Sequence, residues 1–134
     1  MQKKILYTSL LIIVVTYIEV LWYSPEGLSS VDLSRSPIDY LHWLCLFAVI
    51  VTGALLYVFR NKKTRPVYQA VLITLLMMAY WLMINYGEFE ERVANWSTFS
   101  DAEVLYCVSM ESVVPIGVCS VLLLMGFYGL RNKY

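Results

Sequence analysis

Four apolar stretches of this sequence are each long enough to cross a lipid bilayer as an α-helix. They cover about residues 4–23, 37–59, 66–86 and 101–130, and about 20 apolar residues suffice to span the hydrocarbon core. The first stretch is too long for the core of a cleavable signal peptide, so we expect a retained span. The sequence therefore predicts an all-α, polytopic membrane protein, with residues 1–134 forming one domain of four transmembrane helices.

Charged residues are distributed unequally between the connecting segments. Residues 1–4, 60–65 and 131–134 contain no acid, and they hold eight of the ten basic residues: Lys3, Lys4, Arg60, Lys62, Lys63, Arg65, Arg131 and Lys133. The opposite face, which comprises the other two segments and the helix ends next to them, holds eight acids beside only Arg35 and Arg92. Short loops rich in Lys and Arg stay in the cytoplasm during insertion. We therefore expect an antiparallel bundle with both termini cytoplasmic, and the compact loops favour a bacterial inner (plasma) membrane.

Composition narrows the classes of function. The chain is 60% hydrophobic and 15% charged, whereas a soluble domain is about 45–50% apolar and about 25% charged. Its formal net charge is zero, which gives no support for binding nucleic acid. The three cysteines are scattered, so a disulfide framework is not expected. Membrane lipid is the expected surrounding of this chain.

Each expected span carries one strongly polar residue in the third that lies away from the cytoplasm: Glu19, His42, Asn85 and Glu111. At about 1.5 Å per residue, these residues stand about 21–29 Å from the cytoplasmic ends of their helices. An acid inside a span is energetically expensive, which makes it a functional candidate. We predict an intramembrane polar cluster of these four residues that could hold a proton or a cation. The alternative is structural: Glu19 and His42 fix the register of the bundle, or the two carboxylates reach the outer water.

The last span carries a second pattern. Ser112, Cys119 and Gly126 recur every seven residues and share one face of the helix. Small and weakly polar residues mark contacts between helices in lipid, so we predict a helix-packing face there. Pro115 removes a hydrogen-bond donor inside the same helix, and we expect a kink at this position.

Residues 88–99 leave two alternatives open. Phe89, Val93 and Trp96 are spaced four and three apart, which would line one face of a short interfacial helix. The same residues could equally lie in a solvated loop. Directly afterwards, Ser100 and Glu103 have the spacing of a capping box, which predicts the start of the last helix.

Residues for catalysis are missing from the sequence. It has no Ser/His/Asp arrangement, no glycine-rich phosphate loop and no C-x-x-C pair, so we expect no enzymatic activity and no cofactor. His42 and Cys45 with a glutamate would be a metal site with too few ligands, because transition metals need three or four in matched geometry. We therefore predict no metal site.

In size, and in its four expected spans with cytoplasmic ends, the chain resembles the immunity proteins of pore-forming colicins. That resemblance covers architecture and implies a non-enzymatic protein that acts by helix–helix interaction with a membrane partner. A subunit of a larger membrane complex or a homo-oligomer fits the same pattern. The predicted contact is the small-residue face of the last span, assisted by the outer loops.

A glutamate in the first of four spans is also similar to the small multidrug resistance family. This similarity implies the alternative function, a small proton- or cation-coupled transporter in which Glu19 has the corresponding role and Glu111 assists. The strong charge asymmetry and the long outer loops of this chain depart from that family.

Overall fold

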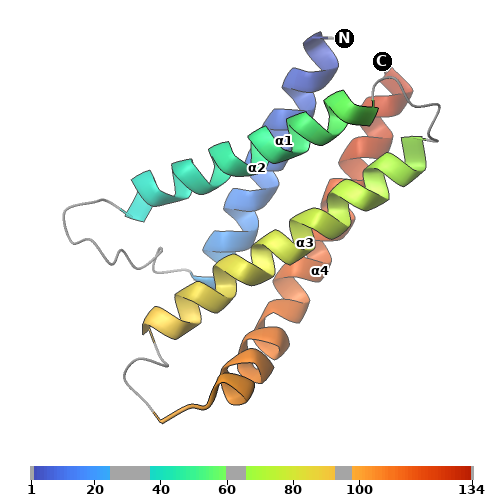
Figure 1. Cartoon of the computed structure of the whole chain (residues 1–134). Helices are drawn as coiled ribbons and strands as arrows, with labels where there is room; N and C mark the ends of the chain where they lie inside the picture. Colours follow the sequence, from blue (N-terminus) through green and yellow to red (C-terminus); the bar gives the residue numbers. More distant parts are fainter. Residues whose placement is uncertain (1, 25–36, 60–65, 93–97, 134) are drawn as a thin grey trace.

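The structure is a computed structural model that describes residues 2–24, 37–59, 66–92 and 98–133. These residues form the helices α1 (Gln2–Tyr23), α2 (Pro37–Phe59), α3 (Pro66–Arg92) and α4 (Asp101–Lys133). Each helix contains a stretch long and apolar enough to cross a membrane. The prediction of an all-helical chain with four such helices is confirmed. Figure 1 shows the N- and C-terminal ends close together at the top of the molecule.

Local sequence explains where the helices begin. Pro37 and Pro66 open α2 and α3, where a missing backbone N–H breaks no intrahelical hydrogen bond. Before α4, the Ser100 backbone N–H donates to Glu103 Oε2 at 2.8 Å, and the Ser100 hydroxyl donates to the same oxygen at 2.8 Å. The expected reach of Glu103 back to Ser100 is therefore confirmed. Val104 N–H donates to the Ser100 carbonyl at 3.0 Å and closes the first turn.

Helix α3 is longer than the sequence predicted. The predicted span ended near residue 86, but α3 continues to Arg92. Arg92 Nε lies 3.2 Å from Glu88 Oε2 one turn earlier, and Phe89 is buried against Val104 and Val108 of α4. Both contacts favour helical backbone, so residues 88–92 form neither a separate interfacial helix nor a loop. Val93 and Trp96 of that prediction lie outside the described residues.

The helices pack unequally. Helix α4 lies chiefly against α3 and α1, while α2 packs chiefly on α1 and also touches α3. Figure 1 shows α1 and α4 running in similar directions, whereas α2 and α3 cross them at an angle. The Tyr80 hydroxyl of α3 donates to the Leu44 carbonyl of α2 at 2.9 Å and so joins these two helices. The main core combines large apolar residues of all four helices: Ile12, Val15, Leu41, Ala48, Ile73, Met77, Trp81, Ile116 and Leu123.

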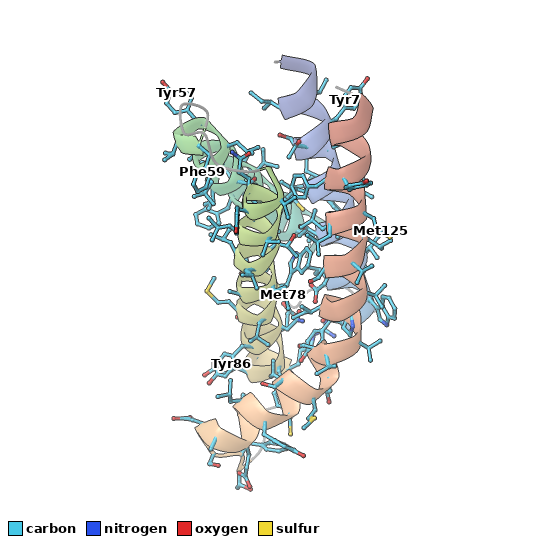
Figure 2. The ribbon with its side chains drawn as sticks, turned by 90° about the vertical axis from the view of Figure 1, so that its right-hand side faces the viewer. Tyr7, Tyr57, Phe59, Met78, Tyr86 and Met125 are labelled. Carbon is cyan, nitrogen blue, oxygen red and sulfur yellow. The ribbon has the colours of Figure 1, made fainter. Side chains whose placement is uncertain are left out.

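Most of the apolar surface points outward. At most 33% of the residues in any one spanning stretch are buried inside the chain. Met125, for example, projects from the outer side of α4, as Figure 2 shows. In Figure 2, Tyr7 and Tyr57 lie toward one end of the molecule and Tyr86 toward the other. An exposed apolar surface of this extent is typical of helices that are surrounded by lipid.

Helix α4 contains Pro115 and is bent. Its 33 residues correspond to a length of about 50 Å, more than the roughly 30 Å thickness of the hydrocarbon core. Figure 2 shows its N-terminal half turning away from the axis of its C-terminal half. Pro115 has no N–H to offer to the carbonyl of Glu111, which weakens the helix at this turn.

Candidate functional site: a buried polar cluster between α1, α3 and α4

Glu19 is completely buried in the interior of the helix bundle. It lies near the C-terminal end of α1, and none of its surface is exposed. Its Oε1 accepts a hydrogen bond from Nδ2 of Asn85 on α3 at 2.9 Å. Its Oε2 is buried without a hydrogen-bond partner among the described residues. A glutamate whose one partner is a neutral amide is unusual, because buried carboxylates are normally paired with a cation.

Asn85 links three helices. Its Nδ2 carries two hydrogens, of which one is donated to Glu19 on α1 and the other to Ser112 Oγ on α4, at 3.0 Å. Both Asn85 and Ser112 are buried, with 0% and 1% of their surfaces exposed. The carbonyl oxygen Oδ1 of Asn85 has no described partner. Glu19, Asn85 and Ser112 are called the polar cluster below.

A second buried contact lies one helical turn away from the polar cluster. Trp81 precedes Asn85 by four residues on α3, and Thr16 precedes Glu19 by three on α1. The Trp81 indole Nε1–H donates to Thr16 Oγ1 at 3.2 Å, and both side chains are fully buried. Trp81 is not among the site residues predicted from the sequence. Its spacing of four from Asn85 was the available signal that it belongs to the interior face.

On the other side of the polar cluster, toward the end of α1, lies Tyr23. Its hydroxyl is buried without a hydrogen bond of good geometry, and Glu111, Glu19 and Glu88 all act on it electrostatically. Glu88 is itself paired with Arg92. Tyr23 thus lies between the buried Glu19 and the exposed Glu111. Sequence reasoning did not single out Tyr23, although its spacing of four from Glu19 places it on the same face.

The structure brings together two of the four residues predicted to form the intramembrane cluster, namely Glu19 and Asn85. His42 is exposed, and its ring packs edge-on against Tyr17 with centroids 5.9 Å apart. Cys45 and Thr52 of the same helix are buried, but His42 is offset around the helix axis by about 60° from Cys45 and about 80° from Thr52. That offset places His42 at the edge of the α1–α2 contact. Glu111 lies near Tyr23, but its side chain is exposed.

The small-residue face of α4 packs inside the chain. Ser112 and Cys119 are buried, and Ser112 belongs to the polar cluster. At Gly126, a Cβ atom would lie 2.5 Å from Cδ2 of Leu11, so glycine lets α1 and α4 approach closely. This face therefore joins α4 to α1 and α3, and it is not free to bind a separate protein as the sequence reasoning assumed.

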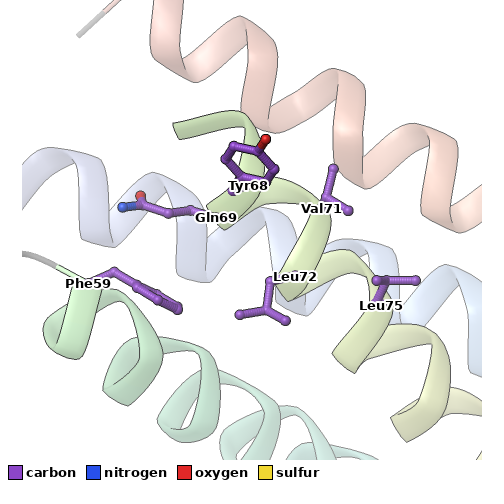
Figure 3. Close-up of a pocket in the computed structure, with 6 residues that line it drawn as sticks. All are labelled: Phe59, Tyr68, Gln69, Val71, Leu72 and Leu75. Carbon is purple, nitrogen blue, oxygen red and sulfur yellow. The ribbon is translucent and has the colours of Figure 1, made fainter. Parts of the chain in front are cut away.

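The described residues form no group of three or more His, Cys, Asp or Glu side chains that could hold a metal ion. An apolar pocket lies at the opposite end of the molecule from the polar cluster, between the end of α2 and the start of α3 (Figure 3). It is lined by Phe59, Tyr68, Gln69, Val71, Leu72 and Leu75. Asn85 is ten residues beyond Leu75, or about 15 Å along α3, so the pocket gives no access to Glu19.

The polar cluster can thus hold or exchange a proton and can tie three helices together, but it offers no nucleophile next to a base. Comparison with known proteins adds no constraint: no family model, no curated protein and no solved structure matches this chain.

Proposed function

We propose that this chain is a small, non-enzymatic protein of the bacterial inner membrane that acts by helix–helix interaction with another membrane protein. Its four helices form an antiparallel bundle, and both termini lie in the cytoplasm. The orientation is supported by the eight basic residues of the terminal segments and the loop at 60–65, because such segments stay in the cytoplasm.

One observation carries the proposal: the most deeply buried polar side chains of the helices contact one another. Glu19, Asn85, Ser112, Thr16 and Trp81 pair across α1, α3 and α4. The surface that faces outward from the spans is dominated by large apolar side chains. A surface of this kind can bind lipid or another apolar helix.

Helix α4 has a face on which a partner helix could pack closely. Gly117 is exposed, and a Cβ atom placed there would meet nothing within 4 Å. The β-branched residues Val113, Val114 and Val121 surround it and are all exposed. Glycine flanked by β-branched residues is typical of helix contacts in membranes, because it lets two backbones approach. We assign the partner contact to this Gly117 face, which replaces the small-residue face considered from the sequence.

The partner is a membrane protein, either a larger complex of which this chain is a subunit or a pore-forming toxin that the chain blocks. A second copy of the chain would use the same kind of contact. Each of these three partners would place an apolar helix against α4, so one experiment tests all of them.

Replacing Gly117 with Leu tests the proposal. A Cβ atom at this exposed position meets nothing within 4 Å, so we expect the fold to be retained, while the larger side chain fills the space that a partner helix needs. When the chain is purified from native membranes in mild detergent, we expect the amount of partner or second copy recovered with Gly117→Leu to be at least tenfold lower than with the wild type. The matched control is Gly129→Leu, a change on the same helix that also meets nothing within 4 Å.

The control should retain the partner, and both variants should unfold at the wild-type temperature. Equal recovery of the same partner with Gly117→Leu and the wild type would contradict the assigned face. A wild-type chain that purifies alone, as a monomer, would contradict the proposed function itself.

A proton- or cation-coupled carrier is the second candidate. The observation that favours it is that Glu19 Oε2 and Asn85 Oδ1 are buried and accept no hydrogen bond from a described residue, so a proton or a cation could bind there. It ranks second because the polar cluster is closed to the surroundings in this structure. A carrier would show substrate-dependent proton flux in liposomes that Glu19→Gln and Glu111→Gln abolish, whereas an interaction protein shows no such flux.

A further inference from the structure

Four buried side-chain atoms of the described residues have no hydrogen-bond partner: Glu19 Oε2, Tyr23 Oη, Asn85 Oδ1 and Ser120 Oγ. Two of these four atoms belong to Glu19 and Asn85, which already contact each other through their other atoms. An unpaired polar atom in an apolar interior destabilises the fold, and two such atoms in one contact call for a common explanation.

Counting donors gives that explanation. Asn85 Nδ2 donates one hydrogen to Glu19 Oε1 and the other to Ser112 Oγ, so the amide has no donor left. An ionised Glu19 has only acceptors, and Asn85 Oδ1 is also an acceptor. Neither unpaired oxygen can satisfy the other unless a hydrogen is added. One proton on Glu19 Oε2 turns that atom into a donor and gives Asn85 Oδ1 its missing partner.

We propose that Glu19 and Asn85 form a proton-binding site in which Glu19 is a neutral carboxylic acid, paired with the Asn85 amide through two hydrogen bonds. In this pair, Asn85 Nδ2–H donates to Glu19 Oε1, and Glu19 Oε2–H donates to Asn85 Oδ1. Ser112 accepts the remaining amide hydrogen and holds the Asn85 side chain in the required orientation.

The charged and titratable groups around the site favour the neutral acid. No described basic side chain pairs with Glu19, whose printed contact is the Asn85 amide. On α1 it is followed by Tyr23, and Glu88 of α3 and Glu111 of α4 act on that tyrosine from the neighbouring helices. Three further groups face this region. Arg92 of α3 pairs with Glu88, and Cys119 of α4 lies within electrostatic reach of Glu19. His42 of α2 packs on Tyr17. Glu19 is completely buried and has no cation as partner among the described residues, so its neutral form is favoured over a buried negative charge.

Loss of the proton has a structural consequence. Ionised Glu19 would break its bond to Asn85 Oδ1 and leave a negative charge in closed, apolar surroundings. The contact that joins α1, α3 and α4 is therefore strong with the proton bound and weak without it. This site does not depend on the proposed partner, because it lies inside the chain.

Glu19→Gln distinguishes the neutral pair from a charged one. A glutamine amide has the shape of the protonated acid, accepts from Asn85 Nδ2, and donates to Asn85 Oδ1. We expect the purified full-length wild type in detergent to unfold at a lower temperature as the pH rises, and Glu19→Gln to be at least as stable and to lose this pH dependence. Glu90→Gln, at an exposed position of α3, is the control and should keep the wild-type pH dependence.

A second measurement locates the proton. Dicyclohexylcarbodiimide reacts with protonated carboxyl groups in apolar surroundings, and mass spectrometry identifies the modified residue. We expect modification of Glu19 that decreases as the pH rises. Preferential modification of another acid, or a Glu19→Gln variant less stable than the wild type at every pH, would overturn the proposal. A wild type stabilised by Na⁺ over K⁺ at fixed pH would also overturn it, because a cation would then occupy the site.

Discussion

Trp81 is the largest side chain that is completely buried among the described residues, and its one polar atom is paired with Thr16. An indole N–H in an apolar interior needs an acceptor, and here the acceptor comes from another helix. Hydrogen bonds between membrane helices stabilise a fold by about 0.6 kcal/mol on average and by up to about 1.7 kcal/mol. The Trp81–Thr16 bond belongs to this class of contacts.

The variant Thr16→Val tests that contact at the scale of one residue. Valine has the shape of threonine but cannot accept a hydrogen bond, so Trp81 Nε1 is left unpaired, and we expect a loss of about 1 kcal/mol in the free energy of unfolding. Unfolding of the purified protein in mixed micelles by increasing denaturing detergent measures the change. The control is Thr74→Val, because the Thr74 hydroxyl donates to Ala70 of its own helix. Equal losses for the two variants would show that the bond between helices contributes nothing.

Residue-scale prediction from the sequence worked within a helix and failed between helices. On the first span, Thr16 and Glu19 are three residues apart, a spacing that predicts one face, and both are buried. On the second span, His42, Cys45 and Thr52 are spaced three and seven apart, which likewise predicts one face, but His42 is exposed. Periodicity gives the relative angles of residues on one helix, and the choice of neighbouring helix depends on packing of the whole chain.

At the scale of elements, α3 shows how a tertiary contact extends a helix. Gly87 and the acids after it have the composition of a loop, yet they are helical through Arg92. Phe89 packs on Val104 and Val108 of α4 and meets Phe99 edge-on at 5.9 Å between ring centroids. The sequence predicted the other helix limits well because apolar length and prolines mark them, whereas this limit depends on a contact with α4.

Phe89→Ala should therefore release the end of α3. Without the ring, the turn loses its apolar contact with α4, and the Glu88–Arg92 pair that remains is of a kind that contributes about 0.3–0.5 kcal/mol. We expect the amides of residues 88–92 to exchange hydrogen for deuterium at least tenfold faster than in the wild type, while the amides around Met77 remain protected. Glu90→Ala, which changes an exposed side chain of the same turn, should leave exchange unchanged. Unaltered exchange in Phe89→Ala would mean that α3 extends by local propensity alone.

For the whole molecule, the proposed orientation predicts which segments a water-soluble reagent reaches. In a chain whose three native cysteines are replaced by alanine, we expect Asn95→Cys to react with a membrane-impermeant thiol reagent in intact cells. Asn61→Cys should react only after the membrane is permeabilised, because the basic loop at 60–65 faces the cytoplasm in this orientation. Labelling of Asn61→Cys in intact cells would reverse the orientation.

The hydrogen bond from Tyr80 to Leu44 is accepted by a main-chain carbonyl, which every amino acid provides. Evolution could therefore exchange the residue at position 44 for any other that keeps the helix, without losing this attachment of α2. The constraint falls on the tyrosine of α3 alone. The side chain at position 44, which packs against the core, can thus be exchanged during evolution while this hydrogen bond between α2 and α3 is inherited unaltered.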